Sequence, residues 1–140
     1  MNQYSQEHAR SYYAASARAS TPWPALDADL SADVCVIGGG FTGVNTAIEL
    51  AQRGLSVVLI EARRIGWGAS GRNGGQLIRG IGHEVEGFAR YVGNEGVRYL
   101  QRAGIESVEL VRQRITENAI ECDLRWGFCE LANTPAQFAA

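Results

Sequence analysis

The chain has 140 residues, of which 46% are hydrophobic and 20% are charged, and its formal net charge is −2. This length is enough for one modest domain with a core of its own, and the composition excludes a disordered chain. The near-neutral charge gives no reason to expect a nucleic-acid partner. No apolar run is long enough for a membrane span, and the first residues lack the basic and apolar regions of a signal peptide.

The first 31 residues form a polar and aromatic segment ahead of the first apolar strand. Pro22 and Pro24 exclude a long helix through that point. We predict that residues 1–31 are an arm lying over the surface of a domain formed by residues 32–140. Trp23 and the neighbouring tyrosines are expected to anchor the arm by packing, and a role in substrate binding stays open for them.

Residues 33–61 predict a strand, a glycine turn, an amphipathic helix and a second strand. The helix is expected from Phe41 to about Arg53, and Gly54 suits the left-handed residue that often follows a helix. The run at 55–60 is apolar except for one serine, which is typical of a parallel strand covered on both faces. This order predicts an α/β fold with a parallel sheet flanked by helices.

The glycine turn has the spacing GxGxxG, with Gly38, Gly40 and Gly43 directly after the first strand. Gly38 would allow a sharp turn, Gly40 would let the backbone approach a pyrophosphate, and Gly43 would let helix and strand pack closely. Glu61 ends the second strand, where it could accept hydrogen bonds from a ribose hydroxyl. The pattern predicts a dinucleotide site; the alternative is an ordinary strand–turn–helix unit whose glycines serve packing only.

A second glycine-rich stretch occupies residues 66–76, where a nicotinamide-binding domain would continue with another helix and strand. Such a loop suits FAD, because FAD binds in an extended form and needs more backbone beside it. Ser70 could bond a phosphate, and Arg72 could bring a positive charge near the pyrophosphate or the flavin. The alternatives are a surface loop with an exposed arginine and, for the whole site, an NAD-dependent dehydrogenase.

The cysteines predict no metal site, because Cys35, Cys122 and Cys129 lack the spacing of metal ligands. Cys35 alternates with valines in the first strand, so we expect it to be a small buried side chain. Cys122 and Cys129 are expected in or near a strand, and a reactive role for either one stays open. This use of cysteine is typical of a reducing compartment and favours a cytoplasmic location.

Two helices are predicted downstream, a short one at 83–91 and a longer one at about 95–118, with a break near Gly93. His83, at the start of the short helix, is expected to be a surface residue. Gly104 fills a gap in the apolar face of the longer helix. The opposite face is expected to be solvated and carries Arg98, Arg102, Glu106, Glu109, Arg112 and Glu117.

The last part of the chain predicts a strand at 122–131 with a turn near Gly127. Thr134 and Pro135 then have the pattern of a helix start. A parallel sheet needs more strands than this sequence supplies. We therefore expect the chain to be the N-terminal portion of a longer protein.

Three stretches resemble the D-amino-acid-oxidase-like superfamily of FAD-dependent oxidoreductases: residues 11–16 in the arm, 33–43 at the first glycine turn and 65–77 in the second loop. Within it the chain is similar to the group of bacterial oxidoreductases that act on gamma-glutamylputrescine. A weaker match continues to residue 125, so the resemblance covers nearly the whole chain. It implies a Rossmann-like FAD-binding domain, of which this chain holds an incomplete N-terminal part.

The resemblance also implies roles for individual residues. The residues lining the ADP phosphates would be Gly38, Gly40, Phe41, Thr42 and Gly43. Glu61 would hold the adenosine ribose, with Ala62 and Arg63 near the adenine. The residues following the pyrophosphate, the ribityl chain and the ring would be Ser70, Arg72, Asn73, Gly74, Gly75 and Gln76. Non-covalent FAD is expected, because the sequence offers no clear His or Cys attachment motif.

The activity implied by the resemblance is oxidation of the C–N bond of an amine or amino acid. The substrate would lose a hydride equivalent from its α-carbon to flavin N5, the imine would hydrolyse, and oxygen would be reduced to hydrogen peroxide. No catalytic residue is predicted within this chain. The alternative is a truncated, non-catalytic nucleotide-binding fragment, and we expect the isolated chain to be inactive.

Overall fold

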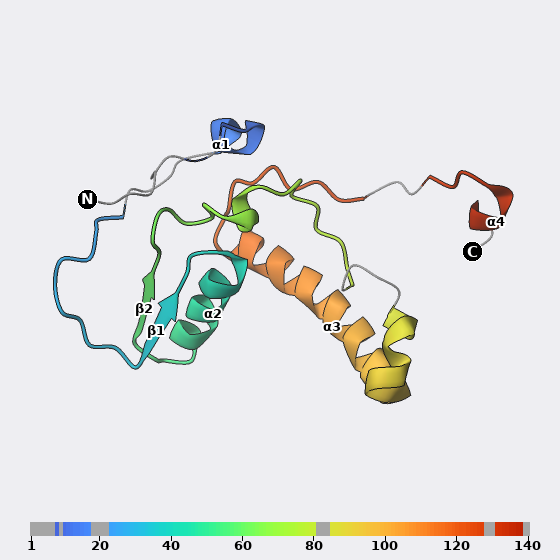
Figure 1. Cartoon of the computed structure of the whole chain (residues 1–140), viewed down its shortest axis with the longest axis horizontal. Coiled ribbons are helices and arrows are strands. Elements are labelled where there is room, and N and C mark those ends of the chain that lie inside the picture. Colours follow the sequence, from blue (N-terminus) through green and yellow to red (C-terminus); the bar gives the residue numbers. More distant parts are fainter. Residues whose placement is uncertain (1–7, 9, 18–22, 81–84, 128–130, 139–140) are drawn as a thin grey trace. The chain divides into compact units, whose positions relative to one another are not determined.

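The computed structural model describes residues 8, 10–17, 23–80, 85–127 and 131–138 (Figure 1). The chain divides into two units, residues 1–77 and 78–140, and each unit is described by itself. The arm boundary predicted at residue 31 stays a prediction. No helix of the described residues is long and apolar enough to cross a membrane.

The first unit is built on a strand–helix–strand arrangement (Figure 1). Strand β1 spans Val34–Ile37, helix α2 spans Phe41–Gln52 and strand β2 spans Val57–Ile60. The two strands are parallel and in register from Val34 opposite Val57 to Ile37 opposite Ile60. Gly54, just after α2, has a φ of +86° and lets the chain reverse toward β2. The parallel pairing and the positions of all three elements were predicted from the sequence.

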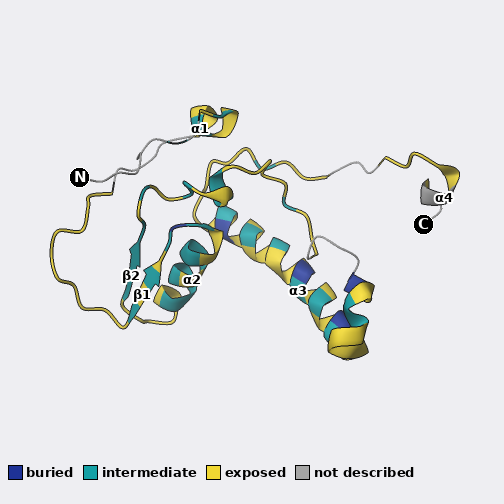
Figure 2. Cartoon of the chain, in the orientation of Figure 1, coloured by how far each residue is buried: buried dark blue, intermediate teal, exposed yellow. Residues whose placement is uncertain are grey.

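Burial alternates along β1, whereas all four residues of β2 are half-buried (Figure 2). Val36 faces α2, because a Cβ built on Gly43 of that helix would lie 3.5 Å from a Val36 methyl group. Successive side chains of a strand alternate between faces, so Cys35 and Ile37 point to the other side. Cys35 is exposed and the Ile37 side chain is 82% exposed. The prediction of a buried Cys35 is therefore wrong, because it falls on the face opposite the helix.

The arm contains a short helix, α1 at Tyr12–Ser16, that the sequence reasoning did not predict. The Ser11 hydroxyl begins it by accepting a hydrogen bond of 3.2 Å from the Ala14 N–H. Tyr12 is 79% exposed and Trp23 is 75% exposed. The prediction that they anchor the arm by packing is wrong, since both rings lie largely in solvent.

The second unit is dominated by helix α3, Ala89–Glu117, which follows the short helix η2 at Val85–Phe88. Gly93 interrupts α3 with a φ of 66° and a ψ of 175°, so the predicted break is confirmed. Gly104 is buried, and a Cβ on it would lie 2.8 Å from the Gly80 nitrogen, which explains why a glycine fills the apolar face. The charged face of α3 is exposed, as predicted. His83 lies outside the described residues.

The predicted strand at 122–131 is wrong in its described part, because residues 122–127 form no strand. A strand needs a neighbouring strand for its hydrogen bonds, and the described residues supply only the β1–β2 pair. Gly127 has a φ of +95°, consistent with the predicted turn. Cys129 lies outside the described residues. Helix α4, Pro135–Phe138, begins at the predicted proline.

Candidate functional site

The glycine turn continues the ladder of the sheet before the chain enters α2. The Gly38 N–H donates to the Ile60 carbonyl at 2.8 Å, and Gly38 then adopts a φ of +102°, which favours glycine. A Cβ on Gly43 would collide with the Gly38 carbonyl. The close packing predicted for Gly43 is thus present, since helix and turn approach to a distance that only glycine permits.

The Glu61 carboxylate lies against this turn, one residue after β2 ends. Its Oε2 accepts a hydrogen bond of 2.7 Å from the Gly39 N–H, and its Oε1 accepts one of 2.9 Å from the Arg63 N–H. Gly39 is buried and Glu61 is half-buried. The parallel register therefore brings the acidic end of β2 to the glycine turn at the end of β1, as the motif predicts.

The second glycine loop is joined to the first turn by two hydrogen bonds. The Gly66 N–H donates to the Gly39 carbonyl at 2.9 Å, and the Phe41 N–H donates to Ser70 Oγ at 2.9 Å. Ser70 belongs to a short helix, η1 at Ala69–Gly71. In the sequence the second stretch comes shortly after Glu61, and the structure adds direct bonds between it and the first turn.

The end of the second loop is shaped by Asn73. Its amide nitrogen donates to the Ser70 carbonyl at 2.8 Å, and its Oδ1 accepts from the Gly75 N–H at 2.9 Å. Gly75 has a φ of +71°. A Cβ on Gly74 would lie 3.1 Å from Oε1 of Gln76. The segment is therefore a turn held by its own side chains, with an exposed backbone surface.

Two arginines share one indole ring. The guanidinium carbons of Arg63 and Arg72 lie 3.8 Å and 4.6 Å from the centre of the Trp67 ring. Arg72 Nε also donates to the Trp67 carbonyl at 3.1 Å. Cation–π contacts of this kind hold flexible cations in place. Trp67 could not be predicted from the sequence, because no regular residue spacing marks an aromatic ring that contacts two arginines.

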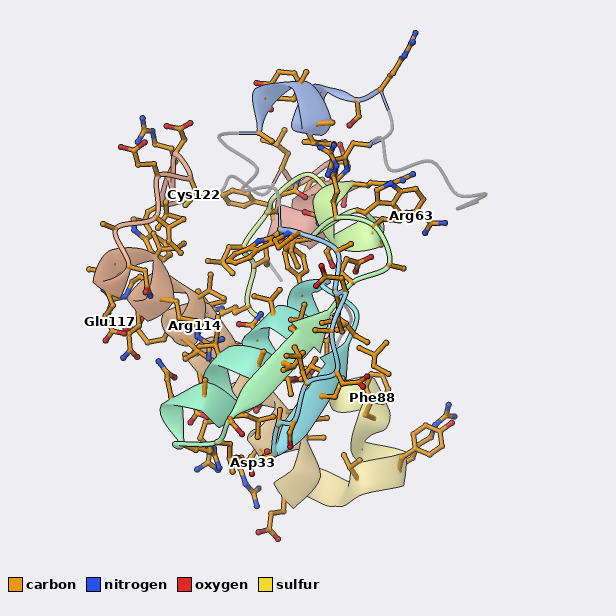
Figure 3. The ribbon with its side chains drawn as sticks, turned by 90° about the vertical axis from the view of Figure 1, so that its left-hand side faces the viewer. Asp33, Arg63, Phe88, Arg114, Glu117 and Cys122 are labelled. Atoms are coloured by element: carbon orange, nitrogen blue, oxygen red, sulfur yellow. The ribbon has the colours of Figure 1, made fainter. Side chains whose placement is uncertain are left out.

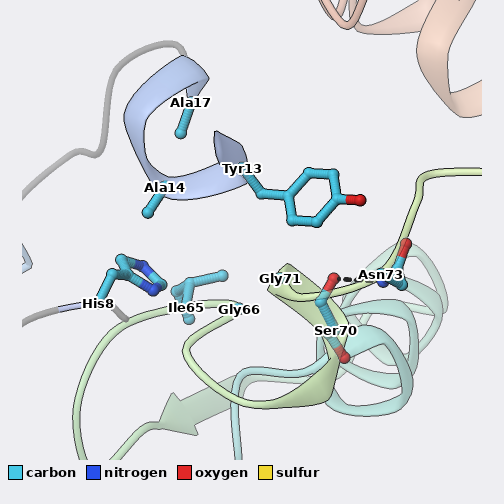
Figure 4. Close-up of a pocket in the computed structure, with 9 residues that line it drawn as sticks. All are labelled: His8, Tyr13, Ala14, Ala17, Ile65, Gly66, Ser70, Gly71 and Asn73. Carbon is cyan, nitrogen blue, oxygen red and sulfur yellow. Dashed lines mark hydrogen bonds between the residues drawn. The ribbon is translucent and has the colours of Figure 1, made fainter. Parts of the chain in front are cut away.

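A cavity of about 270 Å³ lies between the arm and the second loop within the first unit (Figure 4). His8 and Tyr13 of the arm line it from one side, and Ser70 and Asn73 line it from the other. Sequence reasoning left open a binding role for the tyrosines and did not consider His8. A signal for the helix that carries Tyr13 was Ser11, a residue type that often begins helices.

The opposite end of the sheet carries a purely structural pair. The Ser56 hydroxyl and N–H donate to Asp33 Oδ2 at 2.7 and 2.8 Å. These bonds, the hydroxyl bond first, hold the pKa of the Asp33 carboxyl below its usual range. Figure 3 labels Asp33 before β1 and Arg63 after β2, at opposite ends of the strands. The candidate site is therefore confined to the carboxyl ends of the strands.

Most of the predicted site residues come together in this geometry. The turn, the start of α2, Glu61 and the second loop are bonded to one another, while Arg63 and Arg72 meet on Trp67. Thr42 and Ala62 are exposed beside these groups in the chain. Described His, Cys, Asp and Glu side chains form no group that could hold a metal ion.

The sequence profile of the DAO family, described as FAD dependent oxidoreductase, matches residues 33–140. The chain belongs to this family of FAD-dependent oxidoreductases. The match includes both glycine stretches and α3, so the family is defined over most of this chain. It also decides between the two cofactor types left open by the glycine motif, in favour of the flavin family.

Two relatives that match more than nine-tenths of this chain are named oxidoreductases. Gamma-glutamylputrescine oxidoreductase of Escherichia coli (strain K12) is 43% identical over 95% of this chain and 31% of its own length. A probable oxidoreductase, OrdL, of Haemophilus influenzae is 40% identical over 91% of this chain and 30% of its own length. The chain thus spans less than a third of these relatives. No solved structure matches it.

Proposed function

We propose that the protein holds FAD non-covalently in a Rossmann-like domain and oxidises the C–N bond of an amine or amino acid. The observation that carries this proposal is the meeting of three elements at one end of the sheet. The glycine turn, the Glu61 carboxylate and the second glycine loop are bonded to one another there. Membership of the FAD-dependent oxidoreductase family supports the choice of cofactor.

The turn and α2 fit a pyrophosphate. The first N–H groups of a helix have no acceptor within the helix, and its N-terminus carries partial positive charge. Helix α2 begins at Phe41, directly after Gly40. The Phe41 N–H is bonded to Ser70 Oγ, so phosphate oxygens would lie beside Phe41 and meet the N–H groups of Thr42 and Gly43. A Cβ on Gly40 would already lie 3.0 Å from Ser70 Oγ, so a larger residue would narrow the space for a phosphate.

Glu61 fits the ribose. Each of its oxygens accepts one backbone N–H, and each keeps a further lone pair for a sugar hydroxyl. Its negative charge would disfavour a nucleotide with a 2′-phosphate. We assign Ala62 and Arg63, the next residues along the chain, to the side of the adenine.

The second loop fits the rest of the cofactor. Its exposed glycines allow close approach of the backbone, and Arg72 supplies a positive charge whose position Trp67 fixes. We assign Ser70 and Arg72 to the pyrophosphate side. The residues assigned to the ribityl chain and ring are Asn73, Gly74, Gly75 and Gln76.

When bound, FAD would supply the acceptor for the hydride equivalent lost from the α-carbon of the amine, with oxygen reduced to hydrogen peroxide as the final oxidant. The residues of this chain orient the nucleotide part and neutralise its phosphates. The name of the relative that is 43% identical suggests gamma-glutamylputrescine as the first substrate to test.

The decisive experiment is an absorption spectrum of the purified intact protein. We expect flavin bands that bleach when gamma-glutamylputrescine is added without oxygen and return when air is admitted. Acid precipitation should release the flavin into the supernatant, since no covalent link is expected. Flavin bands without bleaching by any amine tested would reject the substrate class, and absence of flavin binding would reject the whole proposal.

A further inference from the structure

Helix α2 begins without a side-chain cap of its own. The residue at its N-cap is Gly40, which has no side chain to accept a hydrogen bond from the first turn. Caps at this position normally come from serine, threonine, aspartate or asparagine. A local cap would also conflict with the second loop, because a Cβ on Gly40 would lie 3.0 Å from Ser70 Oγ.

The missing cap comes from the second loop instead. Ser70 Oγ accepts the N–H of Phe41, the first residue of α2, at 2.9 Å across a separation of 29 residues. Ser70 is itself fixed, because the Asn73 amide donates to its carbonyl at 2.8 Å. The Gly66 N–H, bonded to the Gly39 carbonyl at 2.9 Å, holds the loop against the turn just before Gly40.

We infer that Ser70 is a positioning residue that caps α2 from the second loop and thereby links closure of that loop to formation of the phosphate-facing turn. The cap itself follows from the structure alone. Its effect on FAD binding rests on the proposed function. An accepted bond from Phe41 leaves the Ser70 hydroxyl its own hydrogen for donation. One serine can therefore order the helix start and still face an anion.

The test compares Ser70→Ala with Ser70→Thr in the protein freed of FAD. Amide hydrogen exchange at Phe41, measured by NMR, reports the cap without any cofactor. We expect exchange at Phe41 to become about fivefold faster in Ser70→Ala, the size expected for loss of a helix cap. Ser70→Thr keeps the hydroxyl and should restore the wild-type rate.

FAD titration of the same variants, followed by flavin fluorescence, gives the second readout. Ser70→Ala should bind FAD more weakly and Ser70→Thr nearly as tightly as the wild type. Ser107→Ala is the matched control, because the Ser107 hydroxyl bonds the Gly104 carbonyl within its own helix. This variant should leave both readouts unchanged.

The outcomes separate the two proposals. Weaker FAD binding in Ser70→Ala with unchanged exchange at Phe41 would make Ser70 a direct ligand only and overturn the positioning role. Failure of the wild type to bind FAD would reject the proposed function, while the exchange rates would still decide the cap. If Ser70→Ala does not fold, Asn73→Ala provides a second test, because it keeps the Ser70 hydroxyl but removes the bond that holds the Ser70 carbonyl. Unchanged amide exchange at Phe41 in that variant would also contradict the inference.

Discussion

Glu61 shows how a single residue can serve both the fold and the candidate site. Its two carboxylate oxygens accept the N–H groups of Gly39 and Arg63, so the carboxylate bridges the glycine turn and the segment after β2. The sequence predicted only a contact with a ribose hydroxyl. The structure adds a structural role, since Gly39 is buried and its N–H needs an acceptor.

Replacement of Glu61 by alanine should therefore have two effects. We expect the free energy of unfolding to fall by about 1–3 kcal/mol, because a buried N–H loses a charged acceptor. FAD affinity should fall by roughly tenfold or more, the loss expected for one charge-assisted ribose contact. Urea denaturation and flavin titration measure the two effects. Glu61→Gln keeps one acceptor oxygen and should lose less stability and less FAD affinity than Glu61→Ala. The control Glu106→Ala, at an exposed residue of α3, should match the wild type in stability and in FAD affinity.

The pairing of β1 with β2 determines which loops and side chains meet at each end of the sheet. The register brings the glycine turn and Glu61 together at one end of the sheet. At the other end, Asp33 and Ser56 exchange hydrogen bonds just before the strands begin. The same parallel register thus fixes both ends, and the Asp33–Ser56 pair stabilises it at the end away from the candidate site.

The Asp33–Ser56 pair gives a stability effect that depends on pH. The bonds from Ser56 lower the pKa of Asp33 in the folded state, so its contribution is present above the unfolded pKa of about 3.9. It is lost as the pH falls through the lower folded pKa. We expect Asp33→Ala to destabilise the protein in urea at about pH 7 and to differ much less from the wild type at about pH 3. A difference that stays constant with pH would contradict an ionised Asp33 in the pair.

At the scale of the whole molecule, burial is sparse. Among the described residues, Val85 and Val97 are the buried hydrophobic side chains, and both lie in the second unit. In the first unit, Cys35 and Ile37 leave the β1 side of one sheet face exposed. The described part of that unit therefore has no hydrophobic side chain that is fully buried, and its apolar residues between the sheet and α2 are half-buried.

Exposure of the sheet face can be measured through Cys35. In the Cys122→Ser/Cys129→Ser variant of this chain, Cys35 should react with a thiol reagent at a rate close to that in urea, because its side chain is accessible. The Cys35→Ser/Cys129→Ser variant isolates Cys122, which is also exposed, and provides a matched comparison. Protection of Cys35 by several orders of magnitude would show that this face is covered in solution.

The strand–turn–helix–strand order, the sharp turn at Gly38 and the break at Gly93 could all be predicted from the residues alone. These features follow from local rules, because they depend on apolar periodicity and on backbone conformations that glycine adopts most easily. The three-dimensional structure was needed to show that Ser70 caps α2, that Arg63 and Arg72 share Trp67, and that Cys35 is exposed. Those outcomes depend on which segments meet or leave a face uncovered in space, and no short-range pattern of residues encodes them.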